Sequence, residues 1–218
     1  MPASVGSDRA NNRHEVDHAM KRSDVEIIEK STAYDGYFRV DRYRLRHKLF
    51  AGGWGTEVAR ELFERGHAVA VLPYDPVRDL VVLVEQFRIG AYAAECDPWL
   101  IEIIAGIIDP GETADAVARR EAIEEAGLDI GEMVRIADYL ASPGGTSETV
   151  TLYCGRVDAG NAGGIHGLAA EGEDIRVTTL PFNAIADLLA ERRTHNATLL
   201  IALQWLMLHR DDLRKRWQ

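Results

Sequence analysis

The sequence of 218 residues has few cysteines and no excess of positive charge. Its two cysteines, Cys96 and Cys154, stand in no paired motif, so we expect reduced core side chains rather than a disulfide framework. The formal net charge is −10, which argues against general binding to nucleic acid or to an anionic membrane, because both need a basic surface. An anionic small molecule would therefore need a local cluster of Arg, Lys or metal ions.

Long apolar runs are also missing. None is long enough for a membrane-spanning helix, and the N-terminus lacks the apolar segment of a signal peptide, so we expect a cytoplasmic protein without membrane contact. The seven histidines are scattered without metal-ligand spacing, and we assign them no catalytic role. Hydrophobic residues still make up 46% of the chain, which is enough for one sizeable core.

Composition and periodicity divide the chain into three parts. Residues 1–22 are polar and without period, which predicts a disordered tail. Residues 23–65 hold strand-like stretches, including YFRVDRYRLRHKLF, and predict a small β-rich domain apart from the main core. Residues 66–218 contain strand and helix patterns in mixed order, which predicts a layered α/β or α+β domain.

Local patterns indicate the elements of the main domain. The expected strands are a hairpin at 67–74 and 80–87, a short apolar run at 99–104, and strands at 133–140, 149–157 and 174–180. The expected helices lie at 114–126, at about 182–192 and at about 196–215. A glycine-bearing loop is expected to lead into the first of these helices.

The helix at residues 114–126 carries a group of carboxylates. On a helical wheel Glu121 and Glu125 lie within about 40° of each other, on the small-residue face that would pack on a sheet, with Glu124 at its border. Unpaired buried carboxylates are costly, and a hard cation such as Mg²⁺ removes that cost by taking oxygen ligands. Arg120 lies one turn before Glu124 and can brace the group. Taken alone, EAIEE would more often be a solvated acidic face.

The wider pattern favours metal binding. The segment AGIIDPGETADAVARREAIEEAGL covers residues 105–128. Its fixed positions are Gly106, Glu112, Arg120, Glu121, Glu124, Glu125, Gly127 and Leu128. They match the whole signature of the Nudix hydrolases, so the chain resembles that family, and Ala122 is a mild departure where a bulkier aliphatic residue is common.

The resemblance extends over about residues 35–218 and narrows to the bacterial ADP-ribose pyrophosphatases. Matching segments include RYRLRHKLF, RELFERGHA, LPYDPVRD, EQFRIGAY, LASPGGTSE, GIHGLAAEGEDIRV and IALQWLMLH. Pro143 lies 16 residues beyond Gly127, where that subfamily has its marker for ADP-ribose. The resemblance implies Mg²⁺-dependent hydrolysis of ADP-ribose to AMP and ribose 5-phosphate, with Mn²⁺ as the alternative ion.

The resemblance also implies a fold, an assembly and residue roles. The fold is an α/β/α sandwich with a mixed sheet, preceded by a small N-terminal β domain that is exchanged between the chains of a homodimer. Residues 66–218 would be the catalytic domain. The implied metal ligands are Ala105, through its carbonyl, Glu121, Glu124, Glu125 and Glu173. Glu171 resembles the proposed general base, with Glu124 and Arg120 as further catalytic residues. The implied substrate-binding residues are Arg60, Arg88, Gly106 and Tyr37, the last stacking on adenine in the partner's site.

Other activities stay open at this point. Within the enzymes, the alternatives are hydrolases of other ADP-sugars and nucleotide sugars, of NADH or of diadenosine polyphosphates. A second class is a sensor that binds ADP-ribose without cleaving it, but such modules typically lose the box glutamates that are intact here. A decapping enzyme would need a basic surface, against the charge of −10.

Overall fold

The computed structural model describes residues 20–191 and 196–217. Most of the tail predicted at residues 1–22 therefore lies outside the described residues. The chain forms two compact units, Met1–Leu62 and Phe63–Gln218. No described helix is long and apolar enough to cross a membrane.

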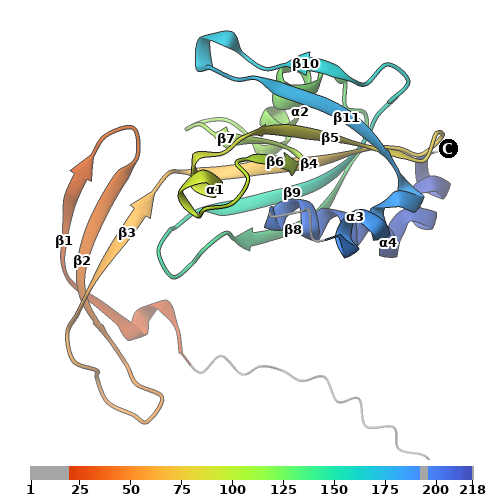
Figure 1. The fold of residues 1–218 in the computed structure, drawn as a ribbon. Coiled ribbons are helices and arrows are strands. Elements are labelled where there is room, and N and C mark those ends of the chain that lie inside the picture. Colours follow the sequence, from red (N-terminus) through yellow and green to blue (C-terminus); the bar gives the residue numbers. More distant parts are fainter. Residues whose placement is uncertain (1–19, 192–195, 218) are drawn as a thin grey trace, which may run out of the picture. The chain divides into compact units, whose positions relative to one another are not determined.

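The first unit contains a three-stranded sheet in the order β1-β2-β3 (Figure 1). A short 3-10 turn, η1 (Arg22–Asp24), leads into β1 (Val25–Asp35), β2 (Arg39–His47) and β3 (Val58–Glu64). All of β1 is exposed, and charged pairs cross the sheet: Arg44 contacts Glu29 at 2.8 Å, and Lys30 contacts the buried Asp41 at 3.0 Å. Both hydrophobic core clusters formed by the described residues belong to the second unit.

The second unit alternates strands and helices. Its strands are β4 (His67–Asp75), β5 (Leu80–Phe87), β6 (Trp99–Glu102), β7 (Ile104–Ile108), β8 (Met133–Leu140), β9 (Thr149–Arg156), β10 (Gly164–His166) and β11 (Ile175–Pro181). Its helices are α1 (Ile89–Ala93), α2 (Ala114–Ala126), α3 (Ile185–Ala190) and α4 (Ala197–Trp217), with 3-10 turns η2 (Ala169–Glu171) and η3 (Phe182–Ala184).

These strands form one eight-stranded sheet in the order β10-β11-β5-β4-β9-β8, with β6 on β5 and β7 on β4. Strand β4 pairs in parallel with β9 and antiparallel with β5 and β7, so the sheet is mixed, as predicted. The predicted hairpin of β4 and β5 pairs only beside its turn, at Tyr74 with Val81 and at Asp75 with Leu80. Farther from the turn, β5 pairs with β6, and β4 pairs with β7, the strand that carries Ala105 and Gly106.

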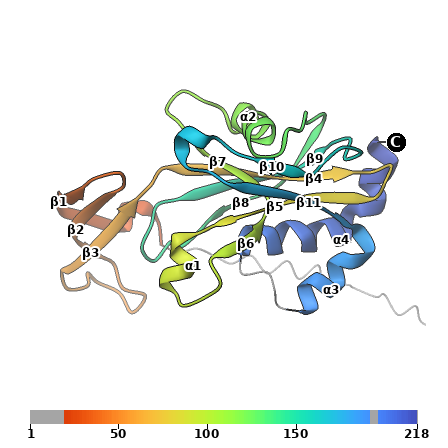
Figure 2. The same cartoon turned by 45° about the horizontal axis from the view of Figure 1, so that its top comes forward.

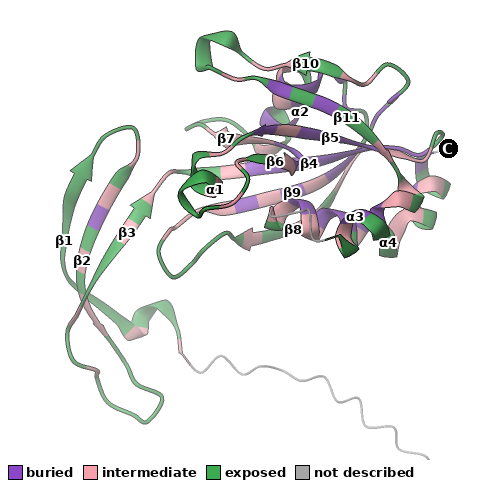
Figure 3. Ribbon diagram, viewed as in Figure 1, coloured by how far each residue is buried: buried purple, intermediate pink, exposed green. Residues whose placement is uncertain are grey.

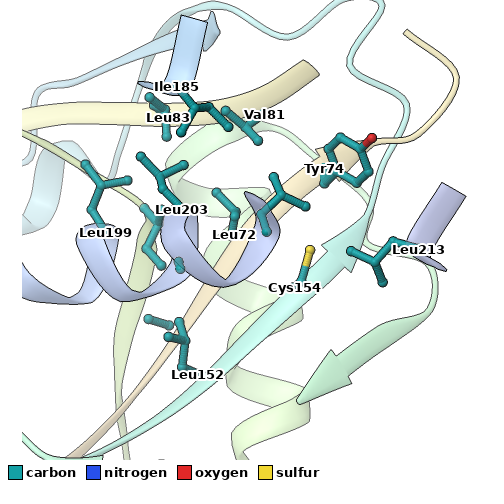
Figure 4. Packing of buried hydrophobic residues seen from close by; sticks show 14 of the residues in the cluster. Leu72, Tyr74, Val81, Leu83, Leu152, Cys154, Ile185, Leu199, Leu203 and Leu213 are labelled. Carbon is teal, nitrogen blue, oxygen red and sulfur yellow. The ribbon is translucent and has the colours of Figure 1, made fainter. Parts of the chain in front are cut away.

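Helices cover the two faces of this sheet, with α2 on one side and α3 and α4 on the other (Figure 2). Burial is concentrated on the central strands and on the helix faces turned toward them (Figure 3). Figure 4 shows the cluster beneath α4, where Leu199 and Leu203 of the helix pack against Leu72 and Leu83 of the sheet. A second cluster, which includes Val69, lies between the sheet and α2. The layered α/β architecture expected from the sequence is therefore confirmed.

We expect Leu203→Ala to lower the free energy of unfolding by about 2–5 kcal/mol, because the side chain is fully buried and truncation leaves a cavity. Urea denaturation followed by circular dichroism measures the change. Leu208 on the same helix is 81% exposed, and Leu208→Ala should change stability by less than about 0.5 kcal/mol. Equal losses in the two variants would contradict the placement of this core.

Several elements differ from the sequence predictions. The predicted glycine-bearing loop before α2 is present at residues 109–113, but the residues just before it belong to the strand β7. The run at 99–104 breaks at Ile103 into two strands with different partners. The helix expected at about 182–192 consists of η3 followed by α3 at Ile185–Ala190, and its last expected residue, 192, lies outside the described residues. Helix α2 has the predicted bounds, whereas α1 and β10 were not predicted. These two segments are short and contain glycine, so pairing and packing with distant residues decide their conformation.

Candidate active site

The carboxylate-bearing helix α2 is closed at both ends by local signals. Thr113 precedes it, and its side-chain oxygen accepts a hydrogen bond from the Ala116 N–H at 3.3 Å. Gly127 ends it with a φ of +63°, a left-handed conformation that favours glycine, and donates to the Ile123 carbonyl at 2.9 Å. The caps fix the register of the helix, and with it the face on which its glutamates lie.

Glu125 and Glu121 face the strand β7. Glu125 is 3% exposed, and its Oε2 accepts a hydrogen bond from the Ala105 N–H at 3.2 Å. Glu121 lies against Gly106 so closely that a Cβ added at Gly106 would stand 2.0 Å from its Oε1. A residue without a side chain is therefore required at position 106 for Glu121 to keep this place.

Arg120 supplies positive charge to the same group. Its Nη1 lies 2.9 Å from Oε1 of Glu121 and 3.0 Å from Oε2 of Glu124, and its Nη2 lies 3.7 Å from Glu112. The bracing contact predicted between Arg120 and Glu124 is present. Arg120 therefore neutralises part of the negative charge of these carboxylates.

Burial disfavours the charged form of these carboxylates. Burial raises the pKa of Glu121 to about 7; the charge of Arg120 opposes this rise, and the charges of Glu124 and Glu173 add to it. It raises the pKa of Glu125 to about 8, against the hydrogen bond from Ala105. Within residues 20–191 and 196–217, no three acidic, histidine or cysteine side chains are already arranged around one metal position. The chemistry of the donors fits a hard cation, but the oxygens of Glu121 and Glu124 are now turned to Arg120.

The loop between β10 and β11 adds one carboxylate to this cluster. The Gly167 N–H donates to the Glu124 carbonyl at 3.2 Å, which joins the start of the loop to α2. Glu173 accepts a hydrogen bond from the Leu168 N–H at 3.0 Å, and its charge acts on both Glu121 and Glu125. Glu171 is exposed in η2. The charge of Glu173 thus raises the pKa of two helix carboxylates, whereas the role of Glu171 stays a prediction.

Arg88 directly follows β5 and lies half-buried beside the cluster. Its charge lowers the pKa of Glu125, in opposition to burial. Its Nε and Nη2 contact Oε2 of Glu102 at 2.9 and 2.8 Å. Glu102 was not among the site residues predicted from the sequence, although a lone acidic residue in the apolar run WLIEII is a signal that could have found it.

Two predicted substrate-binding residues belong to the first unit. Tyr37 is 89% exposed, and its ring packs edge-on against Phe38 with 4.7 Å between centroids. Arg60 is exposed and donates to the Ala59 carbonyl at 2.8 Å. Their part in a site shared between two chains stays a prediction.

Comparisons with known proteins identify the family of the chain. The NUDIX domain family matches residues 64–202. An ADP-ribose pyrophosphatase of Escherichia coli (strain K12) is 53% identical over 196 residues, 90% of this chain and 94% of the relative. One of Haemophilus influenzae is 42% identical over 207 residues, 94% and 95% of the two chains, and a GDP-mannose pyrophosphatase of Enterobacter sp. (strain 638) is 33% identical over 190 residues, 84% and 95%. A solved structure described as an ADP compounds hydrolase shares the fold, with a TM-score of 0.67, 21% identity and coverage of 88% and 96%.

Proposed function

The chain belongs to the NUDIX domain family and is a hydrolase that acts on a pyrophosphate, and we propose that its substrate is ADP-ribose, which it splits into AMP and ribose 5-phosphate with Mg²⁺. The observation that carries the proposal is the carboxylate cluster of α2, in which Glu125 is buried and Glu121 and Glu124 are partly buried, set between β7 and the loop that holds Glu173. The ADP-ribose pyrophosphatases of 53% and 42% identity support this substrate over GDP-mannose, whose pyrophosphatase is 33% identical.

The residues that would hold Mg²⁺ are the Ala105 carbonyl, Glu121, Glu124, Glu125 and Glu173. When bound, the ion supplies positive charge to the pyrophosphate and makes water more acidic. Mn²⁺ is the alternative ion, since it also takes carboxylate oxygens. Binding requires the carboxylates to exchange their contacts with Arg120, which would then remain beside them as an outer partner.

The chain's own residues would bind the substrate and take the proton. Arg88 and Arg60 would hold the phosphates and the terminal ribose, the backbone at Gly106 would lie against the substrate, and Tyr37 would stack on adenine in the partner's site. Attack by a water oxygen on one phosphorus breaks the bond from that phosphorus to the bridging oxygen, which leaves with the other phosphate. A proton of the water passes to Glu171, whose exposed carboxylate lies in the same loop as Glu173.

The test is a substrate panel at fixed enzyme concentration: ADP-ribose, ADP-glucose, GDP-mannose, NADH and diadenosine polyphosphate, with the products separated and Mg²⁺ varied. We expect ADP-ribose to have the highest kcat/KM, with AMP and ribose 5-phosphate as products and no turnover in EDTA. A higher kcat/KM for GDP-mannose or NADH would reject the proposed substrate. Binding of ADP-ribose without turnover of any substrate would indicate a sensor.

We expect Glu171→Gln to lower kcat by about 100-fold with little change in KM, because a base acts in the transition state rather than in binding. The measurement is kcat at saturating Mg²⁺, with Asp174→Asn as a matched control from the same loop. If Glu171→Gln keeps near-normal kcat and Glu173→Gln loses it, the base is Glu173. If both variants are near normal, the loop is only a lid and Glu124 becomes the next candidate.

We further propose a homodimer in which the first units are exchanged. The exposed side chains of that unit include Tyr34, Tyr37, Phe50 and Trp54, which favours burial against a second copy. Sedimentation should give about twice the chain mass of 24.2 kDa. Deletion of residues 24–50 should abolish the dimer and weaken AMP binding, whereas deletion of residues 1–19 should change neither. A fully active monomer would reject the shared site.

A further inference from the structure

Arg88 stands at the end of a chain of hydrogen bonds that begins on the opposite side of the sheet. Asn196 directly precedes α4, and its Oδ1 accepts the Leu199 N–H at 2.9 Å, which makes it the N-cap of that helix. Its Nδ2 donates to Oε1 of Glu102 at 2.8 Å. The other oxygen of Glu102, Oε2, holds Arg88. One side chain of β6 thus connects the start of α4 to the arginine beside the carboxylate cluster.

Both oxygens of Glu102 are engaged, and the residue is only 5% exposed. A buried carboxylate held at both ends has little freedom to rotate, and a charge-assisted pair of this kind is directional. Contact with Glu102 uses Nε and Nη2 of Arg88, and Nη1 has no hydrogen-bond partner among residues 20–191 and 196–217. That nitrogen remains available to an anionic ligand.

We propose that Glu102 and Asn196 are positioning residues that orient Arg88 toward the phosphates of the substrate, an inference that rests on the proposed hydrolysis of ADP-ribose. The rigid helix α4 fixes Asn196, Asn196 fixes Glu102, and Glu102 fixes the plane of the guanidinium. With the plane set before binding, the substrate does not have to order this side chain. Neither Glu102 nor Asn196 touches the substrate in this scheme; each acts through Arg88.

Two variants separate positioning from folding. Asn196→Ser keeps a hydroxyl that caps α4 but loses the amide that reaches Glu102. Glu102→Gln keeps the shape of the side chain but loses the charge that holds Arg88. Glu85→Gln is the matched control, because the Glu85 carboxylate forms an ion pair with Arg176 on the same sheet, and no hydrogen bond or ion pair joins the described residues Glu85 and Arg88.

We expect Asn196→Ser and Glu102→Gln to weaken binding of the α,β-methylene analogue of ADP-ribose by about 10- to 100-fold, with KM raised to a similar extent. Glu85→Gln should leave the affinity for the analogue and the KM unchanged. In an Arg88→Ala background, Glu102→Gln and Asn196→Ser should each weaken binding of the analogue by less than about a further twofold, because both residues act through Arg88. Full additivity in that background would overturn the proposal.

A second readout does not depend on the substrate. The Nε–H of Arg88, identified in nitrogen-15 spectra by its loss in Arg88→Ala, should be protected from exchange with water in the unmodified protein. Protection should fall in Asn196→Ser and Glu102→Gln and persist in Glu85→Gln. Unchanged protection in both variants would overturn the positioning role of Glu102 and Asn196 even if ADP-ribose is hydrolysed. If both variants lose protection but the unmodified protein does not hydrolyse ADP-ribose, the proposed substrate is rejected and the positioning role is still supported.

Discussion

Replacement of Glu125 by glutamine is expected to lower kcat on the order of a thousandfold while the fold is retained, since one charged oxygen donor is lost from the centre of the cluster. Glu125 is the most buried of the helix carboxylates, at 3% exposed, and the Ala105 N–H fixes its orientation. Steady-state kinetics at saturating ADP-ribose and Mg²⁺ measure the effect. Full turnover by the variant would remove Glu125 from the metal ligands.

Stability provides the control for this variant. Burial raises the pKa of Glu125 in the folded chain from its ordinary 4.5 to about 8. Between these two values the folded chain keeps a proton that the unfolded chain has lost, so in EDTA the stability of the unmodified protein falls as pH rises. Glu125→Gln removes the part of this dependence that Glu125 contributes, while Glu121, whose pKa burial raises to about 7, keeps its own part. The urea midpoint of the variant at pH 8 in EDTA should equal or exceed that of the unmodified protein. A large loss of stability would instead assign the kinetic effect to misfolding.

Replacement of Gly106 by alanine is expected to lower kcat on the order of 100- to 1000-fold, because the added Cβ displaces Glu121. That atom would lie 2.0 Å from Oε1, 2.3 Å from Cδ and 2.5 Å from Cγ of Glu121, so the whole end of the side chain must move. The measurement is kcat as a function of Mg²⁺ concentration, and a higher Mg²⁺ requirement should accompany the loss.

Gly90→Ala is the matched substitution for this test. A Cβ added at Gly90 meets no atom within 4 Å, so the variant should keep normal kinetics. If Gly106→Ala retains normal kcat and normal Mg²⁺ dependence, close packing of Glu121 against position 106 is not required for activity.

Local chemistry made part of this site predictable. Thr113 and Gly127 are capping residues on either side of one helical pattern, so the bounds of α2 follow from neighbours in sequence. The helical period then places Glu121 and Glu125 on the small-residue face of the helix, which is the face expected to pack on the sheet. The spacing from Gly106 to Leu128 carries the family resemblance for the same reason.

Pairing between distant segments decided the rest. Residues at 99–108 form one apolar run in the sequence, and only competition among β4, β5 and their partners splits it into β6 and β7. An alternating or apolar pattern predicts that a strand forms but not which strand it joins. Placement of Gly106 under Glu121 depends on that choice.

The sequence by itself determined the family, the carboxylate helix and the layered α/β architecture, because these depend on residues close together in the chain or on periodicity. Only the tertiary structure decided that Asn196, 94 positions beyond Glu102, completes the hydrogen bonding of that carboxylate. It also decided that Glu102 holds Arg88, and that the charge of Glu173 raises the pKa of Glu121 and Glu125. A hydrogen bond or a buried charge depends on distance in space, and the sheet that sets those distances forms from segments far apart in the sequence.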